Sequence, residues 1–341
     1  MDRVNIGLIG AGRIGKMHAE HLAFRIPDAN LLAVADVFVK AAEKCAADYQ
    51  IPAAFQDYHR ILDNPDIDAV VICSSTDTHA QIIEEAAAAG KHIFCEKPID
   101  FDLERIDRAL AAVDKAGVKL QIGFNRRFDP SFKRARDLVA EGKIGKPHIV
   151  RITSRDPQPP PIEYIKVSGG IFLDMTIHDF DMARYLINDE VTEMFAVGEV
   201  LVDPEIGKAG DIDTAIITLR YASGAIGTID NSRKAVYGYD QRVEVFGSEG
   251  AVVVSNNTRD RAVLSDAEGV HGSLPLYFFV ERYTEAYIAE MKAFIDCIQQ
   301  DKTPPVTGVD GRVPVVMGYA AQKSYEENRP VKLSEIDATT G

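Results

Sequence analysis

Up to about residue 124, the chain alternates between short runs of consecutive apolar residues and longer segments with apolar residues at every third or fourth position. Continuous apolar runs are typical of strands buried on both faces of a parallel sheet, and the longer period is typical of amphipathic helices. The pattern predicts strands in residues 4–9, 31–35, 69–73, 92–95 and 118–123, and helices in 16–24, 39–48, 57–62, 80–89 and 102–116. This alternation predicts a doubly wound parallel sheet.

The pattern changes after residue 124, where the segment 125–130 breaks the periodicity, and we place a domain boundary there. Strands with alternating apolar and polar residues are predicted at 148–154, 192–202, 215–221, 225–232, 241–246 and 251–255. Ser223-Gly224 is typical of a hairpin turn between two of them. Two helices, 281–300 and 310–328, follow. The second half therefore predicts an α/β domain with a mostly antiparallel sheet, and the predicted domains are 1–124 and 125–341.

A glycine-rich turn lies between the first strand and the first helix. Gly10, Gly12 and Gly15 have G-x-G-x-x-G spacing, so backbone amides and the helix N-terminus can face a pyrophosphate. Asp36 ends the second strand about 20 residues later, where an acid can accept hydrogen bonds from both ribose hydroxyls of NAD. We expect Arg13 and Ile14 to contribute to the same cofactor site. The alternative is an ordinary tight turn of an α/β protein.

A polar run follows the strand that ends at residue 73. Ligands of open α/β sheets bind beyond the carboxyl ends of the strands, so four side chains of this run are predicted cofactor contacts. They are Ser74, Ser75, Thr76 and His79. The alternative is that residues 74–78 cap the helix 80–89, and both roles are compatible.

The next strand ends in Glu96-Lys97-Pro98. Glu96 and Lys97 are predicted cofactor contacts, and Lys97 is also placed to touch a substrate oxygen beside a nicotinamide. The alternative for Lys97 is a solvated surface charge. Pro98 is a candidate for a cis peptide bond, which would hold Lys97 in a fixed direction.

A second segment with candidate catalytic residues lies at 169–186. Asp174 and His178 are four positions apart, so on a helix they would share one face. A carboxylate beside an imidazole holds its tautomer and raises its basicity, which suits a general base. The alternative is a surface Asp/His pair or a capping contact. Asp181 and Arg184 are expected on another part of the surface as an ion pair.

These residues suffice for hydride transfer from an alcohol to NAD. The cofactor performs the redox step, and the protein orients the reactants and handles the proton. His178 suits the role of the base, Lys97 would stabilise the developing alkoxide, and Asp174 would orient His178 or contact the substrate.

The composition excludes several classes of partner. A formal net charge of −14 over 341 residues argues against nucleic acid and anionic membranes. No apolar run approaches 18 residues, and we expect no membrane span. The four cysteines are widely spaced and form no cluster with histidine, so we expect no metal, no disulfide and a cytoplasmic protein. The chain enters a strand at once, and we expect no signal peptide.

Four segments together resemble the Gfo/Idh/MocA oxidoreductases: 7–15, 35–36, 96–98 and 169–178. Within that family the chain is most similar to the inositol 2-dehydrogenases, through segments 123–129 and 235–244. The resemblance implies a Rossmann domain, a second α/β domain with an open sheet, and association of these sheets into a homotetramer or a dimer. It implies Lys97, Asp174 and His178 as catalytic residues. It also implies substrate contacts at Arg127, Asp156 and Tyr237, beside which we place Asn125.

The resulting hypothesis is NAD-dependent oxidation of myo-inositol to 2-keto-myo-inositol (scyllo-inosose). Side chains of both polarities suit a ring of hydroxyls, and the chain lacks the dense basic cluster that a sugar phosphate requires. The rival substrates are scyllo-inositol and pyranose sugars such as glucose. A hypothesis of another class is a dinucleotide-sensing regulator without turnover, which would have no need of Lys97, Asp174 and His178.

Overall fold

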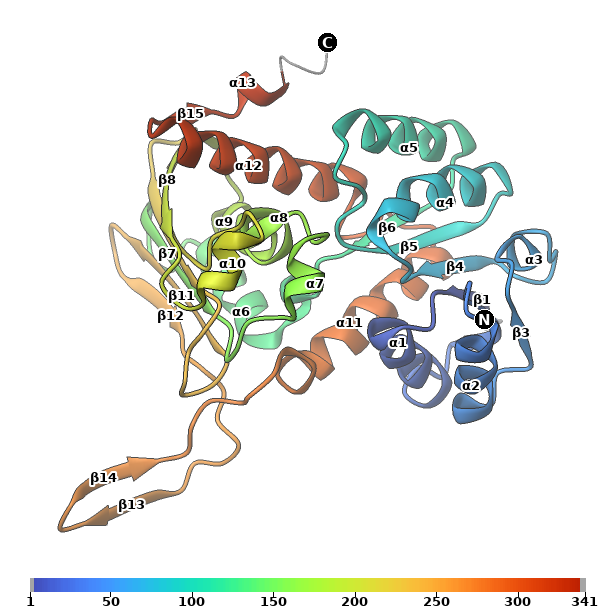
Figure 1. The fold of residues 1–341 in the computed structure, drawn as a ribbon, viewed down its shortest axis with the longest axis horizontal. Helices are drawn as coiled ribbons and strands as arrows, with labels where there is room; N and C mark the ends of the chain where they lie inside the picture. The colour runs from blue at the N-terminus through green and yellow to red at the C-terminus, as the bar shows by residue number, and fades with distance from the viewer. Residues whose placement is uncertain (1–2, 338–341) are drawn as a thin grey trace. The chain divides into compact units, whose positions relative to one another are not determined.

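The structure is a computed structural model that describes residues 3–337, so the outermost residues of the two predicted domains lie outside it. The chain forms two compact units (Figure 1). The first unit contains the described residues up to Asn125 together with Glu285–Val313. The second contains Arg126–Thr284 and the described residues from Pro314 onward. The helices α11 (Phe279–Gln299) and α12 (Gly308–Glu327) each begin in one unit and end in the other.

The first unit is built on a six-stranded parallel sheet, which confirms the predicted Rossmann fold. Its strand order is β3 (Ala53–Phe55), β2 (Ala29–Ala35), β1 (Val4–Ile9), β4 (Ala69–Ile72), β5 (His92–Glu96) and β6 (Leu120–Gly123). Strand β3 was not predicted. It has only three half-buried residues at the sheet edge, too few to produce a recognisable period.

Helices connect the strands of this sheet as expected. They are α1 (Arg13–Phe24), α2 (Val39–Tyr49), α3 (His59–Leu62), α4 (Thr76–Ala88) and α5 (Leu103–Ala116). The side chain of Asp102 caps α5 by accepting hydrogen bonds from the amides of Glu104 and Arg105. The core also contains residues of α11 that are distant in sequence, since Phe294 packs edge-on against Phe94 with ring centroids 5.9 Å apart.

The second unit is built on a seven-stranded mixed sheet. Its order is β12 (Ala251–Val254), β11 (Asp240–Gly247), β7 (Pro147–Arg155), β10 (Ile226–Ser232), β9 (Thr214–Tyr221), β8 (Val191–Glu199) and β15 (Val331–Lys332). Strands β7 and β10 are parallel and the other pairs are antiparallel, which confirms the predicted mostly antiparallel sheet. The predicted turn at Ser223-Gly224 joins β9 to β10.

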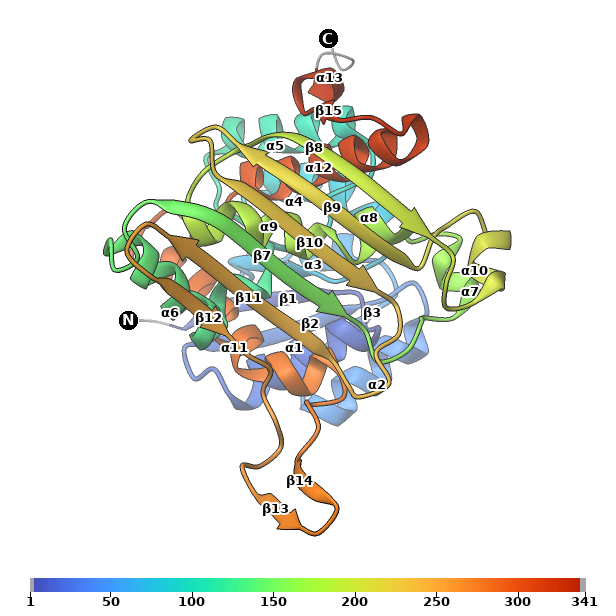
Figure 2. The same cartoon turned by 90° about the vertical axis from the view of Figure 1, so that its left-hand side faces the viewer.

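One face of this sheet is covered by helices of its own unit, and the other carries none of the described helices (Figure 2). Tyr221 on the covered face is buried, and its hydroxyl donates to the Ala183 carbonyl of α9 (Ile177–Ile187). Ile216 and Phe246 on the open face are 51% and 45% exposed. The remaining helical segments are η1 (Asn125–Phe128), α6 (Pro130–Ala140), α7 (Ile162–Ile165), α8 (Gly170–Asp174), α10 (Pro204–Lys208) and α13 (Ser334–Asp337).

A two-stranded hairpin, β13 (Val263–Asp266) and β14 (Gly269–Gly272), extends away from the large sheet of the second unit (Figure 1). It was not predicted, because its strands have four residues each and no buried face that would impose an alternating pattern. No helix of residues 3–337 combines the length and the apolar character that a membrane crossing requires.

Candidate active site

In the glycine-rich turn of the first unit, the backbone packs closely against Gly10 and Gly15, and there is open space beside Gly12. Gly10 has φ +98°, and a Cβ there would collide with the backbone of Cys73. A Cβ at Gly15 would collide with the Gly10 carbonyl. A Cβ at Gly12 would meet no atom within 4 Å, and no side chain caps α1 at this residue. Gly10 and Gly15 therefore allow the turn, and Gly12 leaves room for a pyrophosphate beside the helix N-terminus.

Asp36 links this turn to the second strand. Its Oδ2 accepts a hydrogen bond from the Ala11 amide at 2.7 Å, and its Oδ1 accepts one from the Phe38 amide at 2.8 Å. The carboxylate is therefore held beside the glycine-rich turn at the end of β2. The next two side chains, Val37 and Phe38, are apolar and exposed. These residues fit the adenosine ribose of NAD and offer no cation to a 2′-phosphate.

The polar run after β4 is partly structural. Helix α4 begins at Thr76, earlier than predicted, and Ser75 at its cap makes no side-chain capping bond. The hydroxyls of Ser74 and Thr78 lie 2.7 Å apart, and Thr78 donates to the Ser75 carbonyl. The chain around the cofactor edge of the sheet is therefore ordered by its own hydroxyl groups.

His79 lies buried between two carbonyl groups. Its Nδ1 is 2.8 Å from the Pro98 oxygen and its Nε2 is 3.1 Å from the Ser74 oxygen. Burial lowers the pKa of His79, so the neutral imidazole donates to one of the two carbonyls. His79 thus connects the segments that follow β4 and β5. The Lys97–Pro98 peptide bond is cis, as predicted.

The carboxylate of Glu96 is held by a histidine of the first unit. Its Oε1 lies 2.7 Å from Nε2 of the fully buried His18. Glu290 of α11 is also fully buried, and possible ligand atoms of these three residues lie within 4.8 Å of one another, a spacing suited to a metal ion. However, burial raises the pKa of Glu290 well above its usual range, and the charge of Glu96 raises it further.

The segment with Asp174 and His178 is not one continuous helix, so the prediction that both residues share a helix face is wrong. Helix α8 ends at Asp174, and α9 begins at Ile177. The Ile171 carbonyl accepts hydrogen bonds from the amides of both Met175 and Thr176, which interrupts the regular spacing. The Thr176 hydroxyl lies 2.7 Å from Asn231 Oδ1, so a contact with β10 fixes the break.

Asp174 is held by two partners within the second unit. Its Oδ1 accepts a hydrogen bond from the Tyr164 hydroxyl at 2.8 Å, and its Oδ2 accepts one from Arg233 at 3.1 Å. The guanidinium of Arg233 also donates to Asp211 at 3.2 Å. Asp174 is 13% exposed at its side chain and Arg233 only 1%, so the ion pair is largely shielded from water.

Asp156 lies in the same electrostatic environment. Its pKa is raised to about 7, chiefly by burial; the positive charge of Arg233 opposes the shift, and the negative charge of Asp174 adds to it. Its backbone is fixed by a hydrogen bond from its amide to the Ser232 carbonyl at 2.9 Å. A carboxyl with this pKa can accept a hydrogen bond in one protonation state and donate one in the other near neutral pH.

Arg127, a predicted substrate contact, donates three hydrogen bonds to Asp181 at 2.6–3.0 Å. Arg184 donates two to Glu190 at 2.7 Å. The prediction of a surface pair between Asp181 and Arg184 is therefore corrected, because both side chains are buried and each has a different ion-pair partner. Asn125 is 2% exposed, and its Nδ2 has no hydrogen-bond partner within residues 3–337.

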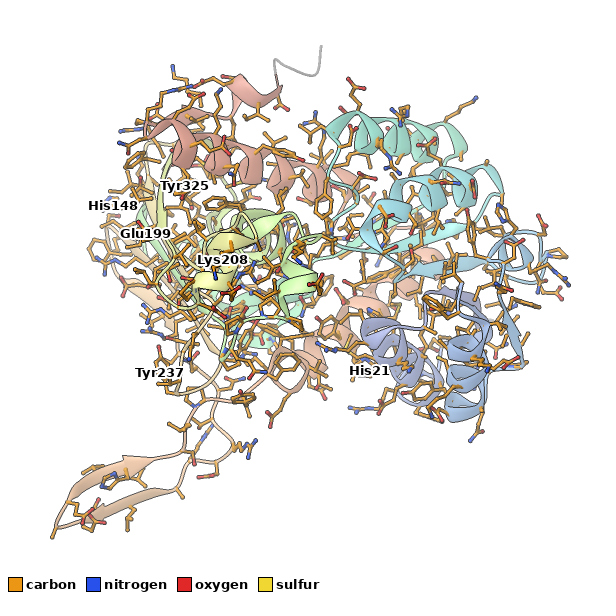
Figure 3. The ribbon with its side chains drawn as sticks, in the orientation of Figure 1. His21, His148, Glu199, Lys208, Tyr237 and Tyr325 are labelled. Carbon is orange, nitrogen blue, oxygen red and sulfur yellow. The ribbon has the colours of Figure 1, made fainter. Side chains whose placement is uncertain are left out.

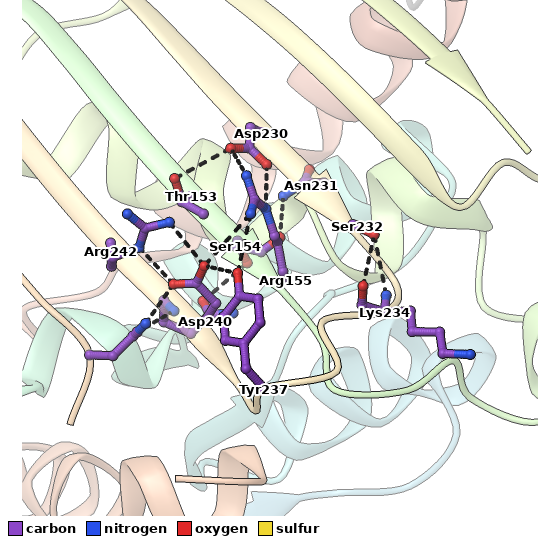
Figure 4. A network of polar contacts seen from close by, with 12 residues as sticks. Thr153, Ser154, Arg155, Asp230, Asn231, Ser232, Lys234, Tyr237, Asp240 and Arg242 are labelled. Carbon is purple, nitrogen blue, oxygen red and sulfur yellow. Dashed lines mark hydrogen bonds and ion pairs between the residues drawn. The ribbon is translucent and has the colours of Figure 1, made fainter. Parts of the chain in front are cut away.

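Tyr237, another predicted substrate contact, belongs to a polar network at the end of the large sheet (Figures 3 and 4). Its hydroxyl donates to Asp240 at 2.6 Å and accepts from Arg155 at 3.2 Å. Arg155 is also paired with Asp230 through two hydrogen bonds. The Tyr237 hydroxyl is therefore fixed by two partners of opposite charge.

Comparison with known proteins places this arrangement in a family. The family model for an oxidoreductase with an NAD-binding Rossmann fold matches residues 4–124, and the model for the GFO/IDH/MocA C-terminal domain matches residues 132–253. The chain belongs to the GFO/IDH/MocA oxidoreductase family. It is 53% identical to the myo-inositol 2-dehydrogenase of Thermotoga maritima, over 98% of this chain and 99% of that protein. It is 48% identical to the inositol 2-dehydrogenase of Rhizobium meliloti, over 97% and 99%.

Solved structures similar to this GFO/IDH/MocA oxidoreductase include a probable dehydrogenase from Thermotoga maritima, with a TM-score of 0.96, 53% identity and coverage of 98% of this chain and 100% of that one. A myo-inositol dehydrogenase from Lactobacillus casei in complex with NAD(H) and myo-inositol has a TM-score of 0.88 and 26% identity, with coverage of 97% and 96%. A scyllo-inositol dehydrogenase from the same species, with NAD(H) and scyllo-inositol, has a TM-score of 0.92 and 31% identity, with coverage of 98% and 100%. The predicted family, the NAD-dependent oxidoreductase class and the cofactor are confirmed.

Five further residues of this oxidoreductase make contacts that the sequence did not predict: His18, Glu290, Arg233, Tyr164 and Asp211. Two of them had a recognisable pattern: His18 lies four residues from Leu22 and Glu290 lies four residues from Phe294, so each is a polar residue within the apolar stripe of its helix. The other three had none, because their roles depend on partners that are distant in the chain.

Proposed function

We propose that this chain catalyses the NAD-dependent oxidation of myo-inositol to 2-keto-myo-inositol (scyllo-inosose). The observation that carries the proposal is the 53% identity with a myo-inositol 2-dehydrogenase over 98% of the chain, together with the presence of Lys97, Asp174 and His178. Bound NAD supplies the hydride acceptor. The glycine-rich turn and Asp36 hold the dinucleotide, with further contacts from Arg13, Ile14 and the segment 74–79.

The proton is handled by three side chains. His178 accepts the proton of the reacting hydroxyl as a general base. Lys97 donates a hydrogen bond to the same oxygen and stabilises its developing negative charge. Asp174, held by Tyr164 and Arg233, orients the base or the substrate. A dinucleotide-sensing regulator needs no such set, which favours the enzyme.

The other hydroxyls of the ring require partners of both polarities. We assign Asn125, Arg127, Asp156 and Tyr237 to this role. The buried Nδ2 of Asn125 can donate a hydrogen bond to a substrate hydroxyl, since it has no acceptor among the described residues. Asp156, with a pKa near 7, can accept a hydrogen bond from a hydroxyl or donate one to it. A site that pairs with each hydroxyl leaves buried polar groups unpaired when a simpler alcohol binds, and so rejects it.

Steady-state rates of NADH formation across a panel of polyols test the substrate. We expect the highest kcat/KM with myo-inositol, with scyllo-inositol second and glucose much lower. A higher kcat/KM with scyllo-inositol would transfer the assignment to that isomer. A pyranose preferred over both would refute the inositol assignment, and NADH binding without oxidation of any polyol would favour the regulator.

We further propose a homotetramer, with a homodimer as the alternative, assembled through the open face of the large sheet. Val197, Ile216, Ile226 and Phe246 are 45–51% exposed on this face, a pattern typical of an interaction surface. Light scattering on the purified protein measures the mass, and Ile216→Glu should reduce it. A monomeric wild type would refute this assembly.

We also propose a cytoplasmic location, supported by four cysteines that form no disulfide among the described residues.

A further inference from the structure

Arg233 is among the most deeply buried charged residues of the described chain, at 1% exposure. It follows β10 directly, and its amide donates to the Asp213 carbonyl at 2.8 Å. Its guanidinium donates hydrogen bonds to two carboxylates: one NH₂ group donates to Asp174 Oδ2 at 3.1 Å and the other to Asp211 Oδ2 at 3.2 Å. A buried arginine without such partners is strongly disfavoured, so these contacts determine its position.

We propose that Arg233 is a positioning residue for Asp174, holding this carboxylate in one orientation. The inference rests on the proposed function in that Asp174 is assigned to the reaction. Arg233 and Tyr164 bind different oxygens of the carboxylate, 3.1 and 2.8 Å away. Two contacts on two oxygens fix both the direction and the plane of the group.

Arg233 also fixes the helix that carries Asp174. Asp211, its second partner, accepts a hydrogen bond from the Ile171 amide at 3.0 Å through Oδ1. Ile171 is at the start of α8 and Asp174 is its last residue, so one guanidinium is connected to both ends of this five-residue helix. A Cβ at Gly170, which has φ +77°, would lie 3.0 Å from Asp211 Oδ1. Asp211 therefore approaches the chain closely at the point where α8 begins.

The charges around Arg233 explain why an arginine is required. Asp156, Asp174 and Asp211 all interact electrostatically with Arg233. Asp179 is a fourth nearby acid, but it has its own cation, since it is paired with Arg126 at 2.6 Å. Without Arg233, three carboxylates would face one another in a shielded environment, and the least costly response is to bind a proton. A lysine would retain the charge, but its single ammonium cannot reproduce the planar fork between two carboxylates.

The experiment compares Arg233→Lys and Arg233→Gln with wild type, with Arg184→Lys as the matched control. Arg184 is also buried in the second unit and also binds a carboxylate through two hydrogen bonds, but it contacts Glu190 rather than Asp174. We expect Arg233→Lys to lower kcat with myo-inositol about 100-fold, the effect of a misplaced reacting group. NADH affinity should stay within about twofold, and Arg184→Lys should leave kcat unchanged.

Two further readouts separate positioning from folding. A smaller fraction of folded enzyme would lower the apparent kcat by the same factor at every pH, and would leave the primary deuterium isotope effect unchanged. We expect the acidic limb of the kcat/KM profile to move to higher pH in Arg233→Gln, and the isotope effect to increase as the chemical step becomes slower. A kcat within threefold of wild type, with an unchanged profile and isotope effect, would overturn the inference.

An infrared measurement tests the same inference without turnover. We expect the carboxylate stretching band that Asp174→Asn removes from the wild-type spectrum to shift in Arg233→Gln, because Asp174 Oδ2 loses a charge-assisted hydrogen bond. If wild type oxidises no polyol, the proposed function fails, but this band still decides whether Arg233 holds Asp174. An unshifted band in a folded Arg233→Gln protein would overturn the inference while leaving the proposed function intact.

Discussion

His18 Nε2 and Glu96 Oε1 lie 2.7 Å apart, and Glu96 immediately precedes Lys97 in the chain. The residue assigned to the reacting oxygen is therefore adjacent to a carboxylate fixed by a fully buried histidine. Glu290 lies next to this pair, and within the described residues neither of its carboxyl oxygens has a hydrogen-bond partner. This arrangement makes the stability of the first unit sensitive to pH.

We expect Glu290→Gln to stabilise the protein at neutral and alkaline pH. Burial raises the pKa of Glu290, so the folded state keeps the proton while the unfolded chain releases it above its ordinary pKa near 4.5. Stability then falls as pH rises from that value to the folded pKa, by about 1.4 kcal/mol for each pH unit. Glutamine resembles the protonated carboxyl and removes this loss.

Thermal unfolding between pH 4 and pH 9 measures this effect. The melting temperatures of Glu290→Gln and wild type should differ little at pH 4 and diverge as the pH rises. Glu285→Gln on the same helix is the control, since Glu285 is 70% exposed at its side chain, and its difference from wild type should not vary in this way. A Glu290→Gln difference that is constant with pH would show that Glu290 is already ionised in the folded protein.

Lys97→Met should lower kcat about 100- to 1,000-fold, because it removes a donor aimed at charge that develops in the transition state. Binding of NADH, followed by fluorescence titration, should remain nearly intact. Lys44→Met on the exposed face of α2 serves as the control for loss of one lysine. If NADH affinity fell in parallel with kcat, Lys97 would be a cofactor ligand rather than a group acting on the substrate.

His178→Gln should slow oxidation by about 100- to 10,000-fold and remove the rise of the rate with pH that a general base produces. Asp156 complicates the profile, because its own pKa is raised to about 7 by burial. Asp156→Asn should therefore change the pH dependence of the KM for the polyol while retaining the rise in kcat. Retention of that rise together with near-normal kcat in His178→Gln would remove His178 from the mechanism.

The cofactor should be NAD rather than NADP. Asp36 presents a carboxylate where the 2′-phosphate would lie, and Val37 and Phe38 provide no compensating charge. Asp36→Ser combined with Val37→Arg should lower kcat/KM for NAD by about 10- to 100-fold and improve NADP. Asp36→Asn is the control that removes the charge alone. Equal use of both cofactors by wild type would contradict this prediction.

Much of the fold could be predicted because it depends on short-range patterns. The strands of the Rossmann sheet are continuous apolar runs, and strands such as β9 alternate buried and exposed residues regularly. The glycines at positions 10, 12 and 15 could be predicted as a unit, since the conformation of a tight turn depends on a few consecutive residues. The short strand β3 and the exposed β13–β14 hairpin have no such pattern.

The sequence by itself therefore determined the class of fold, the cofactor turn and the residue types available for chemistry. Only the tertiary structure decided their partners. Asp174 and His178 are separated by a helix break that a contact with Asn231 fixes, and Asp174 is held by Arg233, 59 positions along the chain. The physical reason is that periodicity reports which side of an element is buried, whereas hydrogen bonds and ion pairs depend on which distant segments the folded chain brings within about 3 Å of one another.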